Sequence, residues 1–174
     1  MITYSETYKL RSFFQISAQL KIDSSPTEIW RIITEKGHLK NFHPYCKSHK
    51  QTKWDGEDCR DEVEFYSGNV VNRIVTDWNE GQSFRIRMNK KNGHSTHIKF
   101  EIIRLENDSF FKLTIETNSF RNKPRLIWHL FAFLVLIPSY KKYLNSICNG
   151  LKYYCETGEK VSRNQFGSHK KFSP

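Results

Sequence analysis

The stretch FFQISAQLKIDSSPTEIWRII, residues 13–33, contains two structural patterns in succession. Apolar and polar side chains alternate over residues 13–22, which predicts a half-buried strand. Directly afterwards, Ser24 or Ser25 can cap a helix, and Pro26 suits a first helical turn. We therefore expect the domain to begin with a strand that leads into a short amphipathic helix, followed by one further helical turn.

Strand and turn patterns fill the chain from residue 45 to residue 120. Turn residues, including the strong hairpin signal Asn92-Gly93, separate six segments, most of which alternate between apolar and polar side chains. Together with the first strand they predict a sheet of seven strands. Sequential antiparallel strands with helices at both ends of the chain are typical of the α+β class.

The last part of the chain has helical periodicity. Apolar residues recur at helical spacing over residues 126–137, Pro138 interrupts this pattern, and a second helix is expected from about residue 139 to residue 157. At 1.5 Å per residue it would be roughly 30 Å long, the width of a small domain. Because an open sheet must bury its apolar face, we predict a curved antiparallel sheet of seven strands around this long C-terminal helix.

Length and composition are those of one domain. The chain has 174 residues, of which 37% are hydrophobic and 14% aromatic, enough for one core. We expect a mobile leader over residues 1–12, the folded domain over residues 13–161 and a disordered basic tail over residues 162–174.

The net charge of +10 is unevenly distributed. Residues 36–53 and 117–155 contain no acidic side chain, which favours a basic face. Such a face suits an anionic partner, such as nucleic acid, acidic lipid or an acidic ligand, although surplus lysine also serves solubility. Nucleic acid is not expected, because no binding module is recognisable and the aromatic residues lie at buried positions of the pattern.

The spacing of the cysteines and a short apolar segment indicate in which cellular compartment the protein resides. None of the four cysteines forms a CxxC pair, so neither a zinc site nor another metal or cofactor is expected. Residues 126–137 are too few to cross a membrane. We interpret the protein as cytoplasmic, with residues 121–142 forming either a cavity-lining helix or an interfacial helix on an anionic membrane surface.

Several of these features resemble a known family. Pro26, Ile29 and Trp30 in the first helix, Phe42-His43-Pro44 after it, and the ending LKYYCETGEKV over residues 151–161 are similar to START/Bet v 1-like domains. This superfamily is also called SRPBCC, or polyketide cyclase/dehydrase and lipid transport. The resemblance covers about residues 13–161. It implies a helix-grip fold, in which a seven-stranded sheet grips the long helix and leaves a cavity between them.

The resemblance also implies where a ligand would lie. Fourteen inward-facing residues are candidates for the cavity lining, and for each of them the alternative is a position in a solid core. His129 and Tyr140 are the candidates for orienting a ligand. The full set is Phe65, Ile74, Phe84, Ile86, Met88, Ile98, Phe100, Leu113, Ile115, His129, Phe133, Ile137, Tyr140 and Leu144.

Three functions are compatible with this reading. We expect the binding, or the transport, of a hydrophobic small molecule such as a lipid or a polyketide-like compound. A polyketide-cyclase/dehydrase-like enzyme using the same cavity is the first alternative, and a module that contacts a protein or a membrane through its basic face is the second. No catalytic residue is assigned, because the charged residues of the strands alternate with apolar ones and should face solvent.

Overall fold

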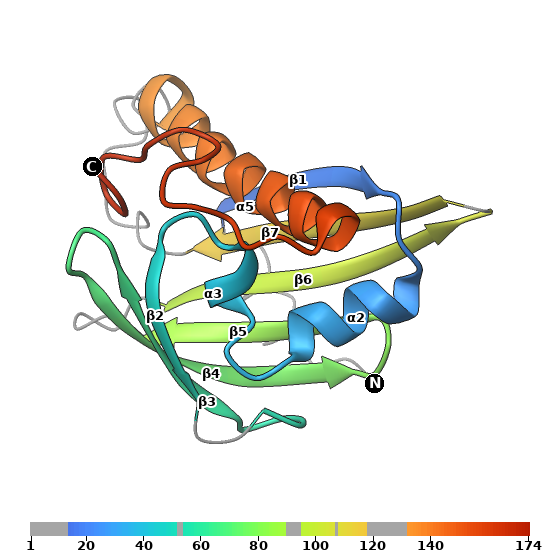
Figure 1. The fold of residues 1–174 in the computed structure, drawn as a ribbon. Helices are drawn as coiled ribbons and strands as arrows, with labels where there is room; N and C mark the ends of the chain where they lie inside the picture. Colours follow the sequence, from blue (N-terminus) through green and yellow to red (C-terminus); the bar gives the residue numbers. More distant parts are fainter. Residues whose placement is uncertain (1–13, 52–53, 90–94, 107, 118–131) are drawn as a thin grey trace.

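The computed structural model describes residues 14–51, 54–89, 95–106, 108–117 and 132–174. Figure 1 shows a curved sheet with one long helix lying across its concave side. Two short helices, α2 (Pro26–Thr34) and α3 (Leu39–Phe42), lie on the same side of the sheet. This arrangement confirms the predicted α+β class and the predicted order of elements.

The sheet has seven antiparallel strands in the order β1-β7-β6-β5-β4-β3-β2. Strands β2 to β7 pair with their neighbours in sequence order. Strand β1 pairs with β7 and forms the other edge of the sheet. The strands are β1 (Phe14–Ile22), β2 (Cys46–Gln51), β3 (Arg60–Phe65), β4 (Val70–Asn79), β5 (Ser83–Asn89), β6 (Ser95–Leu105) and β7 (Asp108–Thr117). The seven-stranded curved sheet is thus confirmed.

Burial alternates along the strands as a half-buried sheet requires. In β6 every second residue from Thr96 to Ile102 is buried on the concave face. The register shifts between Val75 and Asp77 in β4 and between Cys46 and Ser48 in β2. Such bulges increase strand twist and bend the sheet, and they help it to curve around the helix.

Helix α2 follows the predicted capping pattern. The Ser25 side chain accepts a hydrogen bond from the Glu28 amide at 3.1 Å, and Pro26 occupies the first turn. Ile29 and Trp30 are buried. Trp30 packs edge-on against Trp78 and Phe84, with ring centroids 5.2 and 6.0 Å away. Helix α2 therefore fills the concave face at one end of the sheet.

The long helix is preceded by a π-helical segment, η1 (Ala132–Leu136), and runs as α5 (Ile137–Thr157). Pro138 lies in the first turn of α5, where its missing N–H leaves no hydrogen bond unmade. Gly158 ends the helix with a φ of 73°, the left-handed conformation that glycine adopts without strain. Helix α5 packs mainly against β1 and also contacts α3 and β7 (Figure 1).

The tail is folded, so the prediction of disorder over residues 162–174 is wrong. After α5 the chain turns back, and the Val161 amide donates to the Asn41 carbonyl at 2.9 Å. Phe172 packs against Tyr143 and Phe65, with ring centroids 4.4 and 4.8 Å away. Further aromatic contacts and hydrogen bonds hold the same segment, so packing orders residues whose composition is typical of disorder. The predicted leader, residues 1–12, lies outside the described residues.

The crossing of α5 and α3 requires a residue without a side chain. A Cβ atom at Gly150 would overlap the backbone carbonyl oxygen of Phe42. We predict that Gly150→Ala lowers the free energy of unfolding by about 2–3 kcal/mol, as overpacking against a rigid backbone does. Chemical denaturation measures this change. Asn145→Ala on the exposed side of α5 is the matched control and should shift it by at most about 0.5 kcal/mol. Equal stability of both variants would contradict the tight crossing.

Candidate functional site

A pocket of about 710 Å³ lies at the end of the sheet opposite α2. It is bounded by the β3–β4 turn, the ends of β5, β6 and β7, the first turns of α5 and the folded tail. Its apolar lining consists of Phe65, Val70, Val71, Ile74, Met88, Ile98, Ile115 and Phe172. Its polar lining consists of Arg60, Asn69, Asn72, Arg73, Arg87, Thr96, Tyr140, Tyr143 and Lys171.

The structure divides the fourteen predicted cavity residues into two groups. Six of them line the pocket: Phe65, Ile74, Met88, Ile98, Ile115 and Tyr140. Five are buried in the solid core instead, with at most 3% exposure: Phe84, Ile86, Phe100, Leu113 and Leu144. Ile137 packs at the edge of that core. His129 lies outside the described residues, and so does the side chain of Phe133.

The core group is closed off from the pocket by aromatic packing. Phe84 stacks on Phe100, with centroids 4.6 Å apart, and Trp54 approaches Phe84 edge-on at 5.9 Å. Trp30 from α2 covers the same ring. These rings fill that end of the sheet, whereas at the other end the described part of the chain has no helix equivalent to α2.

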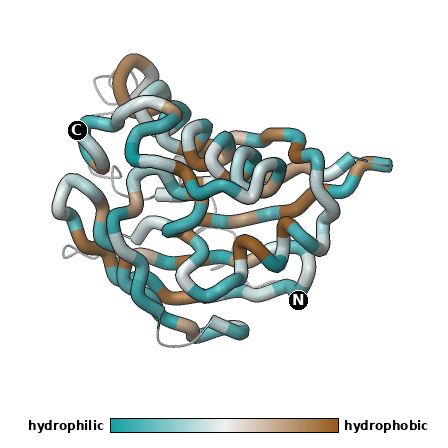
Figure 2. Tube along the Cα trace, viewed as in Figure 1, coloured by the Kyte–Doolittle hydropathy of each residue, from teal (hydrophilic) through white to brown (hydrophobic). Residues whose placement is uncertain are grey.

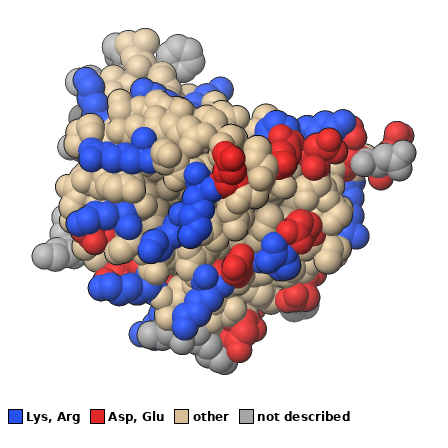
Figure 3. All heavy atoms as spheres, in the orientation of Figure 1, with Lys and Arg blue, Asp and Glu red and all other residues tan. Residues whose placement is uncertain are grey.

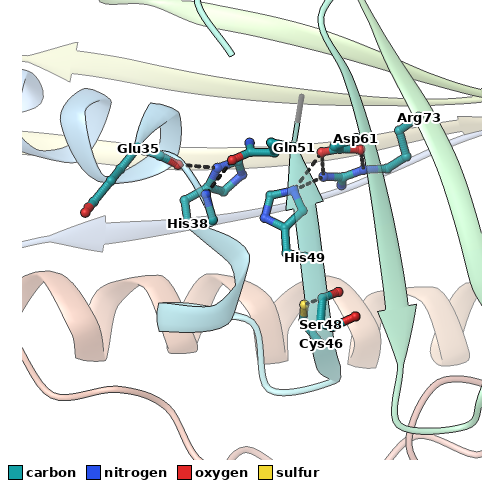
Figure 4. A network of polar contacts seen from close by, with 9 residues as sticks. Glu35, His38, Cys46, Ser48, His49, Gln51, Asp61 and Arg73 are labelled. Carbon is teal, nitrogen blue, oxygen red and sulfur yellow. Dashed lines mark hydrogen bonds and ion pairs between the residues drawn. The ribbon is translucent and has the colours of Figure 1, made fainter. Parts of the chain in front are cut away.

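A buried ion pair borders the pocket. Arg73 projects from β4 and its Nε donates to Asp61 Oδ1 at 2.7 Å, while its Nη2 donates to Oδ2 (Figure 4). The side chains of Arg73 and Asp61 are 6% and 0% exposed. Burial opposes ionisation of Asp61, but the Arg73 guanidinium outweighs it, so the pKa of the Asp61 carboxyl lies below its usual range. The pair is therefore charged, and the carboxylate neutralises Arg73.

Behind this pair, away from the pocket lining, lies a cluster of histidines. His49 Nε2 contacts Asp61 Oδ2 at 2.8 Å and therefore carries the proton, because an ionised carboxylate only accepts. His38 Nδ1 contacts the Glu35 carbonyl oxygen at 2.9 Å. This nitrogen therefore carries the N–H of the ring, because a carbonyl oxygen also only accepts. The imidazoles of His38 and His49 meet edge to face, with centroids 4.9 Å apart. Burial lowers the pKa of both.

Four buried polar atoms around these rings have no partner within the described part of the chain. They are the acceptors His38 Nε2 and His49 Nδ1 and the donors Gln51 Nε2 and Trp54 Nε1. The Gln51 oxygen is used, because it accepts from the Gly37 amide (Figure 4). Internal water normally satisfies groups of this kind. No group of three His, Cys, Asp or Glu side chains among the described residues is arranged to hold a metal ion.

Comparison with known proteins identifies the fold. No protein-family model and no curated protein matches the chain, but solved structures do. A START superfamily protein from Mycobacterium smegmatis has a TM-score of 0.60 at 13% identity, covering 82% of this chain and 97% of its own. Ara h 8.0201 has 0.61 at 10% identity, covering 83% and 99%. The chain has the START/Bet v 1-like (SRPBCC) helix-grip fold.

A third helix-grip structure is longer than this chain. DynU16, a protein of the dynemicin biosynthetic locus, has a TM-score of 0.63 at 12% identity, covering 86% of this chain and 51% of its own. This chain thus spans about half of DynU16. At these identities the comparisons establish the helix-grip fold and its element order, and confirm the resemblance seen in the sequence.

The sequence reasoning missed Asp61, Arg73 and His49. A signal was present, because Asp61 shares its strand face with Val63 and Phe65, and the same alternation applies to Arg73 and Val75. The segment of β4 was expected to turn Ile74 inward. The structure instead buries Arg73 and Val75 on the concave face and leaves Ile74 at the pocket rim. In a helix-grip sheet, an ionic residue at an inward position indicates a buried pair.

The buried imidazoles predict acid sensitivity. Burial lowers the pKa of His43 to about 3, and the pKa values of His38 and His49 are also lowered. Below about pH 6.5 the unfolded chain therefore binds more protons than the folded one, and stability falls as the pH falls. The slope should reach about 1.4 kcal/mol per pH unit for each such histidine.

Urea denaturation between about pH 7.5 and pH 5 measures this slope. In His43→Gln, which removes the hydrogen bond between His43 and Tyr143, the protein should be less stable but its slope should be shallower by about the contribution of one histidine. An unchanged stability over this interval in the wild type would show that the histidines are protonated in the folded state.

Proposed function

We propose that the protein binds a hydrophobic small molecule in the pocket between the sheet, the start of α5 and the tail. The observation that carries the proposal is the pocket itself, with a volume of about 710 Å³ and a wall of aromatic and aliphatic side chains. Pockets of about 300–1,000 Å³ with an apolar lining and a few polar groups are typical of small-molecule sites. A lipid or a polyketide-like compound fits this description. The corresponding role of the protein is to carry this compound in the cytoplasm.

The affinity would come from burial of apolar surface. Each square ångström of apolar surface removed from water contributes about 25 cal/mol, so a ligand burying about 300 Å² gains about 7 kcal/mol before the cost of immobilising it. Met88, Ile98 and Ile115 offer flexible and branched surfaces on the sheet, and Phe172 covers the ligand from the tail.

The lining favours binding over acid–base catalysis. Among the described residues that line the pocket there is no Asp, Glu, His or Cys. Burial raises the pKa of Tyr140 and of Tyr143, which moves both phenols further from neutral pH. General acid–base catalysis works best with a group whose pKa lies near the working pH. A polyketide-cyclase/dehydrase-like enzyme in the same pocket is therefore the weaker candidate.

A second candidate function is contact with an anionic membrane. Leu134 and Val135 in η1 are 61% and 50% exposed, and Lys141 and Lys142 follow them on the surface of α5. Figure 2 shows a hydrophobic segment at this tip, at the top of the view. Apolar side chains next to lysines are typical of interfacial segments. No described helix is long and apolar enough to cross a membrane.

Ligand binding can be tested with a neutral fluorescent dye and by native mass spectrometry. We predict that purified protein binds Nile red and carries a co-purified apolar compound. Met88→Trp, which fills the pocket, should weaken Nile red binding at least about tenfold, because most of the buried area is lost. Leu105→Trp, at an exposed site outside the pocket, is the matched control and should bind as the wild type does. Consistently empty protein without dye binding would refute the proposal.

Membrane contact can be tested by vesicle flotation. The protein should float with vesicles that contain phosphatidylserine and less with neutral vesicles. The double variant Leu134→Ser and Val135→Ser should lower the partition coefficient onto these vesicles about thirtyfold, because each substitution removes roughly 1 kcal/mol of apolar burial. Leu105→Ser, which changes an equally apolar exposed residue elsewhere, should leave flotation unchanged. Equal flotation of both variants would contradict a role for η1.

A further inference from the structure

A guest that lies against the apolar wall of the pocket meets the polar groups of the same, concave face of the sheet. The register places Arg73 opposite Met88, and Met88 opposite Thr96, so these three side chains share that face. Arg73 and Thr96 are 7% and 4% exposed, and both line the pocket. Tyr140 and Tyr143 reach the same pocket from α5. The hydrogen bonds of these side chains therefore bear on the chemistry of the guest.

Thr96 is satisfied within the protein, whereas Arg73 is satisfied only in part. The Thr96 hydroxyl donates to Thr117 Oγ1 at 3.1 Å. Arg73 uses Nε and Nη2 to bind Asp61 (Figure 4). Because these two nitrogens form one edge of the planar guanidinium, Nη1 lies on the side away from Asp61. Nη1 has no hydrogen-bond partner among the described residues, so Arg73 keeps a donor for the pocket that it lines.

The position of one proton on His43 determines how the Tyr143 hydroxyl is used. The Tyr45 amide donates to His43 Nδ1 at 3.2 Å, so this nitrogen is an acceptor and carries no hydrogen. Burial lowers the pKa of His43 to about 3, so the ring is neutral and its single N–H is on Nε2. His43 Nε2 lies 3.2 Å from the Tyr143 hydroxyl, whose oxygen therefore accepts this hydrogen bond. The O–H of Tyr143 is left without an acceptor in the described part of the chain.

The donors of Tyr143 and Arg73 belong to one polar site. Burial raises the pKa of Tyr143, and the positive charge of Arg73 opposes this rise, so the phenol and the guanidinium are close enough to interact. Tyr140 precedes Tyr143 by one helical turn, and burial alone raises the pKa of its phenol. This side of the pocket thus presents more hydrogen-bond donors than acceptors. A buried donor without an acceptor is costly, and a guest can supply the acceptor.

The charge of this polar site is balanced. Asp61 neutralises Arg73 inside the protein. Other cations of this region lie on the surface: Figure 3 shows Lys and Arg over the start of α5 and the tail, where Lys141 and Lys142 are exposed. Solvent screens such charges. An anionic group would lose its hydration at a site without net charge, so an uncharged acceptor suits the two donors better.

We propose that the guest carries an uncharged oxygen acceptor, such as the carbonyl of a ketone, ester or amide, and that the Tyr143 hydroxyl and Arg73 Nη1 donate hydrogen bonds to it. The apolar body of the guest lies against Met88 and Ile98 on the same face. This inference rests on the proposed function of the pocket and adds the chemical class of its ligand.

The experiment compares three ligands that share a naphthalene ring. 2-Acetylnaphthalene offers a ketone oxygen, 2-ethylnaphthalene has nearly the same shape without that oxygen, and 2-naphthoate carries a negative charge. Each displaces Nile red, whose own dissociation constant is measured for every variant. In the wild type the ketone should bind about tenfold more tightly than the naphthoate, because the carboxylate sheds its hydration without gaining an ion pair.

The ratio of the affinities for the ketone and for the ethyl compound reports the hydrogen bonds. Its change in a variant cancels the difference in hydrophobicity between the two ligands. Tyr143→Phe should lower this ratio about fivefold, the loss of one hydrogen bond. Tyr45→Phe is the matched control and should retain the full ratio, because the Tyr45 hydroxyl donates to the Gly167 carbonyl at 3.0 Å and does not line the pocket.

Arg73 is tested in a double variant. Arg73→Met is combined with Asp61→Asn, so that no buried charge is left unpaired. The ratio should fall about tenfold, because a donor on a charged group is lost. A second measurement needs no variant: the carbonyl stretching band of the isotopically labelled ketone should move to lower frequency when the wild type binds it, as it does in a hydrogen-bonded carbonyl.

The outcomes distinguish the two proposals. An unchanged ratio in Tyr143→Phe and in the Arg73 double variant, or a carbonyl band that does not move on binding, would overturn the carbonyl inference and leave the pocket function standing. Naphthoate that binds as tightly as the ketone would overturn the uncharged class of the ligand. If neither Nile red nor any of the three ligands binds the wild type, the proposed function itself fails.

Discussion

A single helix cannot cover the concave face of a strongly curved seven-stranded sheet, and the rest of this structure follows from that constraint. Helix α5 packs mainly against β1 at one edge, with a smaller contact to β7. The remaining concave surface, over β3 to β6, needs other cover. At one end α2 provides it, because Trp30 fills the space above Trp78 and Phe84. At the other end no helix equivalent to α2 lies among the described residues, and the pocket of about 710 Å³ remains.

Charged side chains separate the filled end of the concave face from the end that holds the pocket. Asp61, Arg73 and His49 lie between the pocket and the rings of Trp54 and Phe84. Buried charges are expensive unless they are paired and hydrogen-bonded, and here carboxylate and guanidinium satisfy each other. The apolar part of the pocket lining ends beside this ion pair. Because Asp61 neutralises Arg73, the pair adds no net charge to this side of the pocket.

The tail has two roles. Phe172 packs on Tyr143 and Phe65 and so extends the hydrophobic core beyond α5. The same residue and its neighbour Lys171 form part of the pocket wall. Backbone hydrogen bonds fix this segment, the Ser67 amide to the Phe172 carbonyl at 2.9 Å among them.

Local patterns were enough to define the elements of this protein. Alternation in strands, Ser25 and Pro26 at the start of α2, and Gly158 after α5 are set by neighbours in the chain, so they can be read without a structure. The order of these elements then indicated the helix-grip fold. Alternation, however, reports which face a residue occupies and not what lies above that face.

Tertiary contacts therefore decided the site. Phe100 and Ile98 are adjacent inward positions of β6, yet Phe100 is covered by aromatic rings and Ile98 lines the pocket. Asp61 and Arg73 are 12 residues apart and meet only because β3 and β4 pair. The tail is polar in composition, and its few rings order it only because aromatic residues of α5 and the sheet offer a surface for them. Each of these results depends on packing between distant segments, which no local pattern of residues encodes.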